Sequence, residues 1–254
     1  IAVGLHACLI RGRLSEALFM SSDSKDVEVL ALRAIVLFAL SDIKALKEVT
    51  ETLDAQISDE SEPSDRIRLS TVKVLLAAAN KDTSVIMCVM EFDSLLETYP
   101  EQVESPLVET MFTLYVVGLV LREVGQISKA ERIADTLEEM ARSKNHRMFL
   151  ALVENLRGNI CNYRGEFDQS EKHYRAFKRI SESLGFRLGI AMSMNNLGTL
   201  KLNSLSLEEA LDFFEQSFEM MEMESGRIIA LANLGEISTV LGRYSEAESY
   251  LLKG

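Results

Sequence analysis

The 254-residue sequence contains no tryptophan, three prolines and three cysteines, and each scarcity narrows the choice of fold. Proline interrupts helices, so a chain this poor in proline can hold many of them. Cys8, Cys88 and Cys161 are odd in number, far apart and set in apolar surroundings, which is typical of reduced core cysteines. The sequence therefore favours a helical protein in a reducing compartment, and we expect a cytoplasmic location.

Long apolar runs are also missing. A membrane span needs about 18 to 20 consecutive apolar residues. The most hydrophobic stretch, Met111 to Leu121, is shorter than this, because Glu109 precedes it and Arg122 follows it. The first residues lack the basic start, apolar block and small-residue cleavage site of a signal peptide. We expect no interaction with a membrane.

Basic residues are too few for a nucleic-acid partner. Lys and Arg number 27 against 39 Asp and Glu, which gives a net charge of −12. Proteins that bind DNA or RNA usually carry a basic stripe that neutralises phosphates. We therefore predict no direct contact with nucleic acid.

The motifs of common catalytic and metal sites are absent as well. The three histidines, His6, His146 and His173, have no cysteine or carboxylate partner at a metal-ligand spacing. The acidic segment from Ser58 to Asp65 lacks the alternating ligands and central glycine of a calcium loop. No phosphate-binding loop, dinucleotide fingerprint or nucleophile elbow occurs. We predict no enzyme activity, no metal and no cofactor.

What the sequence does contain is an internal repeat. Four segments align without gaps across their first half, and each carries a glycine, at Gly118, Gly158, Gly198 and Gly235. The glycines are 40, 40 and 37 residues apart. A repeat of this period indicates stacked supersecondary units rather than one globular core.

Further positions of the repeat describe a helical hairpin. Twelve residues after each glycine stands a small residue, and four residues later a larger or apolar one follows: Ala130 and Ala134, Ser170 and Tyr174, Ala210 and Phe214, Ala247 and Leu251. Three repeats have a turn glycine, Gly125, Gly165 or Gly242, and the other has Leu205. A glycine in the first helix and a small residue in the second allow the two helices to cross closely.

This pattern resembles the tetratricopeptide repeat family. The period exceeds the usual 34 residues, as in the variety found in kinesin light chains and in the sensor regions of maltose-activator-type transcription regulators. The family's signature tryptophan is absent, and so is the customary proline at the end of the second helix. The resemblance implies an all-α, right-handed superhelical solenoid of about seven antiparallel hairpins that binds a partner non-enzymatically.

The resemblance is strong from residue 106 onward and faint before it. We expect four regular repeats at about 111–150, 151–190, 191–227 and 228–254, preceded by divergent hairpins in 1–105, all in one continuous solenoid. In the divergent part, Gly12 and Ala17 mark one turn, and Ala45 follows a helical stretch from Val27 to Leu40. A further helix pair is expected between Ser64 and Tyr99. Because the chain lacks an initiator Met and stops within a periodic segment, we expect a piece of a longer protein with neighbouring domains.

Family resemblance implies that the first helix of each hairpin lines the concave face, and asparagines gather there. Asparagine disfavours helix interiors, so its repeated placement on one face indicates a role. The candidate ligand-binding residues are Asn155, Asn159, Asn162, Tyr163, Met192, Asn195, Asn196, Thr199, Asn203, Asn233 and Glu236.

Two interpretations of these asparagines stay open. They can grip the backbone of an extended peptide, or they can join neighbouring helices and fix the packing of the repeats. The leading function is a scaffold that binds a protein or peptide segment. A ligand-sensing arm of a larger signalling or transcription regulator and a structural module that self-associates through the ends of the array are the alternatives.

Overall fold

The computed structural model describes residues 8, 14–100, 107–221 and 224–253. Thirteen helices and no strand occur in these residues, which confirms the all-α prediction. The helices are α2 (Leu14–Ser21), α3 (Val27–Ala39), α4 (Ile43–Gln56), α5 (Pro63–Ala79), α6 (Val85–Thr98), α8 (Val108–Glu123), α9 (Ile127–Ser143), α10 (Arg147–Tyr163), α11 (Phe167–Leu184), α12 (Arg187–Asn203), α13 (Leu207–Met220), α14 (Glu224–Val240) and α15 (Tyr244–Leu251).

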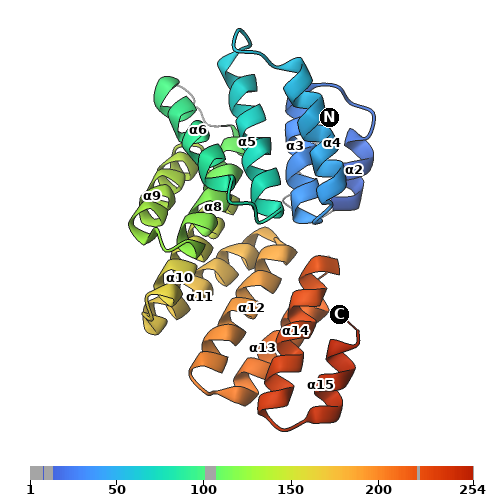
Figure 1. The fold of residues 1–254 in the computed structure, drawn as a ribbon. Coiled ribbons are helices and arrows are strands. Elements are labelled where there is room, and N and C mark those ends of the chain that lie inside the picture. The colour runs from blue at the N-terminus through green and yellow to red at the C-terminus, as the bar shows by residue number, and fades with distance from the viewer. Residues whose placement is uncertain (1–7, 9–13, 101–106, 222–223, 254) are drawn as a thin grey trace. The chain divides into compact units, whose positions relative to one another are not determined.

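From α3 onward the described helices pair in sequence order as six hairpins, which confirms the helical-repeat architecture (Figure 1). Gly12, the glycine of the first predicted turn, lies outside the described residues, and Ala17 of α2 is buried. The chain divides after Leu150 into two compact units, 1–150 and 151–254, called unit 1 and unit 2 below.

The turn between the two helices of each hairpin has the same backbone conformation. One residue there adopts a positive φ: Ser41, Lys81, Gly125, Gly165, Leu205 and Gly242 in the six hairpins. A left-handed residue ends the first helix sharply enough for the second to fold back against it. The first hundred residues therefore share this turn with the later repeats, although two of their turns carry no glycine.

The buried position after the turn differs from the expectation in the divergent part. Ala45 was expected to take the place of the small residue, but it is only half-buried. Leu46, five residues after Ser41, is fully buried, at the spacing at which Ala130 follows Gly125. A leucine therefore stands in the first hairpin at the position that a small residue occupies in the later repeats.

Local sequence signals set several helix ends. The Asp26 carboxylate accepts a hydrogen bond from the backbone N–H of Val29 at 3.1 Å, and the Asp42 carboxylate accepts one from Ala45 at 3.0 Å. Each satisfies a donor that the first turn of a helix leaves unpaired. Pro63 begins α5, where its missing N–H costs nothing.

In unit 1 a buried ion pair joins α5 and α8, each of which is the first helix of its hairpin. Arg68 of α5 donates from Nε to Glu109 Oε1 of α8 at 3.2 Å and from Nη1 to Asp65 Oδ1 at 3.0 Å. The side chains of Arg68 and Glu109 are 13% and 3% exposed. Burial opposes the charge of Arg68, yet the carboxylates around it raise the pKa of the guanidinium. The pair therefore ties α5 to α8.

In unit 2 the repeat glycines make room for large side chains. A Cβ added at Gly158 would lie 2.5 Å from the Tyr174 ring, and one at Gly198 would lie 2.7 Å from the Phe214 ring. Both rings are 1% exposed. Glycine is thus required where the second helix of the hairpin packs its ring against the first.

Candidate functional site: an asparagine ladder on three first helices

The predicted site residues lie on α10, α12 and α14, the first helices of the three hairpins of unit 2. Their positions are best compared by counting from the repeat glycines, Gly158, Gly198 and Gly235. Asn155 and Asn195 stand three residues before a glycine, and Asn196 and Asn233 stand two residues before one. These two positions meet between neighbouring helices.

The first contact joins α10 to α12. Asn196 donates from Nδ2 to Asn155 Oδ1 at 2.7 Å. Asn155 is 1% exposed. Asn159, one turn further along α10, donates from Nδ2 to the backbone carbonyl of Asn155 at 2.8 Å and lies 3.4 Å from Asn155 Oδ1. The Asn155 amide is therefore fixed by residues of two helices.

The second contact repeats the first between α12 and α14. Asn233 donates from Nδ2 to Asn195 Oδ1 at 2.7 Å. As in the first contact, the donor Asn233 stands two residues before a repeat glycine, Gly235. The acceptor Asn195 stands three residues before the repeat glycine of the preceding hairpin, Gly198. We call these two hydrogen bonds the rungs of an asparagine ladder. The position that would offer the next acceptor holds Ala232, so the ladder ends at α14.

Three of the four asparagines in the rungs use only one side of the amide group. Asn195 Nδ2, Asn196 Oδ1 and Asn233 Oδ1 have no hydrogen-bond partner among the described residues. The three side chains are half-buried. The Thr199 hydroxyl is turned back to the carbonyl of Asn195 at 3.1 Å. A row of oriented donors and acceptors thus lies along the first helices.

The remaining predicted residues surround the ladder to different degrees. Asn162 and Met192 are half-buried, Asn203 and Glu236 are exposed, and Tyr163 is 52% exposed.

An exposed apolar residue of α14, Ile229, is not among the residues predicted from the sequence. Ile229, at 56% exposure, stands six residues before its glycine, as Met192 does before Gly198. Aligning α14 with α12 at that position would have found it.

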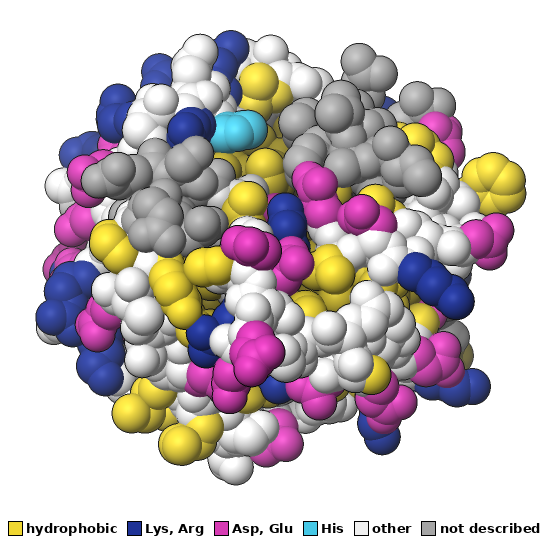
Figure 2. All heavy atoms as spheres, turned by 90° about the horizontal axis from the view of Figure 1, so that it is seen from above, with side chains coloured by type: hydrophobic (Ala, Val, Ile, Leu, Met, Phe, Trp, Pro, Cys, Tyr) yellow, Lys and Arg dark blue, Asp and Glu magenta, His cyan; other side chains and the backbone are white. Residues whose placement is uncertain are grey.

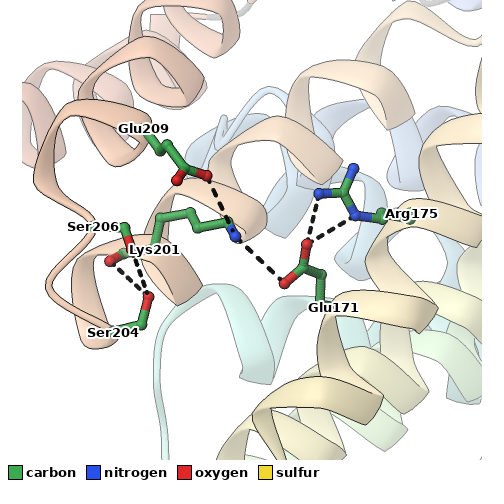
Figure 3. Close-up of polar contacts among 6 residues, drawn as sticks. All are labelled: Glu171, Arg175, Lys201, Ser204, Ser206 and Glu209. Atoms are coloured by element: carbon green, nitrogen blue, oxygen red, sulfur yellow. Dashed lines mark hydrogen bonds and ion pairs between the residues drawn. The ribbon is translucent and has the colours of Figure 1, made fainter.

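An ion-pair network joins neighbouring hairpins of unit 2 (Figure 3). Lys201, at the end of α12, lies 3.5 Å from Glu171 Oε2 of α11 and 3.4 Å from Glu209 Oε2 of α13. Arg175 donates from Nε to Glu171 Oε1 at 2.8 Å. Partial burial opposes the charge of Glu171, but Arg175 and Lys201 outweigh it and lower the pKa of this carboxyl. The network holds the hairpin α10/α11 against α12/α13.

The described residues contain no group of three or more His, Cys, Asp and Glu side chains that could hold a metal ion. His173 Nδ1 lies 2.7 Å from Glu154 Oε2 within one hairpin, and His6 lies outside the described residues. None of the helices in the described part is long and apolar enough to cross a membrane.

Comparison with known proteins agrees with this geometry. Residues 149–223, which include the first rung, match the family model of the tetratricopeptide repeat. This part of the chain is a run of tetratricopeptide repeats.

Solved structures extend the likeness of the fold beyond that segment. BtubC (BKLC) from P. vanneervenii superposes with a TM-score of 0.56 at 16% identity, over 83% of this chain and 87% of that one. The apo form of RapI superposes with a TM-score of 0.58 at 15% identity, over 100% of this chain and 74% of that one. No curated protein sequence matches the chain. At these identities the likeness concerns the fold alone.

Proposed function

We propose that unit 2 binds an extended peptide segment of a partner protein along the asparagine ladder. The observation that supports this proposal is the set of half-used amides: Asn195 Nδ2 is a donor, and Asn196 Oδ1 and Asn233 Oδ1 are acceptors, with no other partner in the described residues. An extended backbone offers alternating C=O and N–H groups that such atoms can pair.

The rungs prepare the site before a ligand arrives. Each rung holds its asparagine in one orientation at 2.7 Å, so the amides lose little rotamer freedom when a peptide binds. Ordering of side chains costs about 0.5 to 1.5 kcal/mol for each mobile side chain in an interface. Packing of the helices and binding of the peptide are thus served by the same residues.

The surroundings of the ladder favour a particular ligand chemistry. Met192 and Ile229 offer apolar contact at equivalent positions of α12 and α14, and Tyr163 is exposed at the end of α10. Glu236, the residue after the repeat glycine Gly235, is exposed. The ligand is a segment with apolar side chains and a basic or neutral character, because the chain carries a net charge of −12.

The test uses a substitution that preserves the ladder. Asn195→Asp keeps the Oδ1 acceptor that receives the Asn233 amide but replaces the outward Nδ2 donor with an oxygen. Linear peptides are selected from a random library on the whole chain, and those without acidic residues are taken forward. Their dissociation constants are measured by fluorescence anisotropy.

We expect Asn195→Asp to weaken these peptides at least tenfold, because a peptide carbonyl then loses its donor. Asn145→Asp makes the same change in unit 1 and should leave affinity unchanged. Circular dichroism verifies that both variants fold. The peptides carry no acidic side chains and are amidated at the C-terminus, so a loss of affinity with Asn195→Asp is not caused by repulsion from the new carboxylate. Equal binding by Asn195→Asp and the wild type would refute the proposal.

A further inference from the structure

Leu205 stands out among the turn residues of the hairpins. It adopts a φ of 59°, a conformation that costs a non-glycine residue about 1 kcal/mol or more. Ser41 and Lys81 show that the turn tolerates other residues, but their side chains are polar. Leu205 is apolar and 78% exposed. Its side chain therefore contributes little to the packing of the hairpin.

The two neighbouring turns also present large apolar side chains. Phe167 follows Gly165 by two residues and is 46% exposed, and Tyr244 follows Gly242 by two residues and is 71% exposed. We call Phe167, Leu205 and Tyr244 the turn edge. Single exposed apolar residues need no explanation, whereas one on each of three consecutive turns forms a set.

Contacts between neighbouring hairpins place the three turns next to one another. The rungs show that α10, α12 and α14 are direct neighbours, and packed helices lie about 8 to 10 Å apart. Lys201 reaches Glu171 and Glu209 across the first two turns, and Leu202 and Leu241, at the ends of α12 and α14, pack on one cluster. The turns therefore stand side by side at about 8 to 10 Å intervals.

That interval matches the repeat of a helix. At a rise of about 1.5 Å per residue, seven residues of an α-helix advance about 10.5 Å and return to nearly the same face. A helix of about 15 residues with an apolar stripe of heptad spacing would contact all three turns in succession.

Charge gives the second part of the partner's chemistry. The three turn segments, 163–168, 203–209 and 240–246, contain five carboxylates and two arginines, a net charge of −3. The carboxylates are Glu166, Asp168, Glu208, Glu209 and Glu246. All five are exposed. Two of them already have a basic neighbour: Glu209 pairs with Lys201 at the base of the middle turn (Figure 3), and Glu246 lies 3.9 Å from Arg243. Glu166, Asp168 and Glu208 are therefore the carboxylates best placed to pair with a partner. Opposite charge steers and selects a partner.

We propose that the turn edge docks a basic amphipathic helix of a partner protein, with Leu205 as the central contact. Phe167, Leu205 and Tyr244 are not residues of the asparagine ladder, although Tyr163 and Asn203, at the ends of α10 and α12, belong to the first two turn segments. Leu205 inserts between apolar side chains of the helix, Phe167 and Tyr244 flank it, and the carboxylates pair with lysines or arginines beside the apolar stripe.

The test uses a labelled 21-residue helical peptide with leucine at the first and fourth positions of each heptad and lysine elsewhere. A second peptide carries glutamate in place of lysine. Dissociation constants are measured by fluorescence anisotropy with the whole chain. We expect the lysine peptide to bind the wild type and the glutamate peptide to bind at least tenfold more weakly.

Leu205→Gly is the decisive variant, because three other repeats place glycine at this turn and the fold should be undisturbed. It should weaken the lysine peptide about tenfold, while its urea midpoint does not fall. Leu252→Ser removes an equally exposed side chain at the other end of α15 and should bind like the wild type. Asn195→Asp should also bind this helix normally, which separates the turn edge from the peptide site.

Several results would overturn the proposal. They are absence of binding by the wild type, equal affinity for both peptides, equal affinity of Leu205→Gly, or an equal loss with Leu252→Ser. Light scattering of the unliganded chain adds one more: a dimer that Leu205→Gly converts to a monomer would assign the turn edge to a second copy of the chain instead.

Discussion

The same substitution at two repeat glycines should have opposite effects on stability. Gly198→Ala and Gly235→Ala each introduce one methyl group at the same repeat position. The added Cβ would lie 2.7 Å from the Phe214 ring in the first case and 2.7 Å from Leu251 in the second. Carbon atoms in contact are normally about 3.5 to 4.0 Å apart, so both methyl groups overlap their neighbour by nearly 1 Å.

The difference is whether the neighbour can move. Phe214 is 1% exposed and is packed with Leu211, Leu234 and Ile237, so overpacking should cost about 3 kcal/mol. The gain in helix propensity from glycine to alanine returns about 1 kcal/mol, which leaves Gly198→Ala about 2 kcal/mol less stable than the wild type. Leu251 is 58% exposed and free to rotate. Gly235→Ala should therefore lose nothing and gain up to about 1 kcal/mol.

The free energy of unfolding is measured by urea titration followed by circular dichroism at 222 nm. Phe214→Leu in the Gly198→Ala background should recover part of the loss, because the smaller side chain relieves the overlap. Equal stability changes for Gly198→Ala and Gly235→Ala would refute the reasoning that the rigid ring, rather than the helix position, makes glycine necessary.

Two further predictions concern the ion pairs. Arg68→Met leaves the Glu109 carboxylate buried without its guanidinium and should cost about 3 kcal/mol in urea unfolding, whereas Arg68→Met with Glu109→Met should recover most of it; a double variant as unstable as the single one would contradict this. Glu171→Gln should destabilise the chain at pH 7 by about 0.5 to 1 kcal/mol. Because the pKa of Glu171 is lowered, its contribution is present above its ordinary value of 4.5 and is lost as the pH falls through the folded value. Thermal melts should therefore show the two proteins converging below pH 4.5, and a gap that persists in acid would count against the network.

Much of the architecture could be predicted from the sequence because small and large side chains recur at fixed positions of the repeat. Gly198 and Phe214 stand 16 residues apart, as do Gly158 and Tyr174, and the structure packs each ring on its glycine. The order of these residues along the chain was enough to predict two helices crossing at that point.

The contacts between hairpins were less accessible. The sequence placed asparagines at equivalent positions, but it could not show that residues three before one glycine meet residues two before the next, because that offset depends on how the helices rotate against each other. The pair Arg68 and Glu109 lies 41 residues apart with no periodic signal. Leu205 looked like a weak match in the alignment, and its exposed position became evident only with the turn in place.

The two proposed surfaces differ in the kind of contact that they offer. On the face drawn in Figure 2, apolar side chains lie among carboxylates. The ladder supplies polar atoms for a peptide backbone, and the turn edge supplies apolar contacts with negative charge around them. Asn195→Asp should therefore weaken binding at the ladder alone, and Leu205→Gly should weaken binding at the turn edge alone.

The most direct test of the peptide site is selective [15N]Asn labelling of the chain. The sequence has nine asparagines, seven of them among the predicted site residues and two, Asn80 and Asn145, in unit 1. On addition of a selected peptide, the side-chain NH2 signals of Asn195, Asn196 and Asn233 should shift together while those of Asn80 and Asn145 stay in place. Unchanged ladder signals at saturating peptide would contradict the account and leave the asparagines as residues that only pack the repeats.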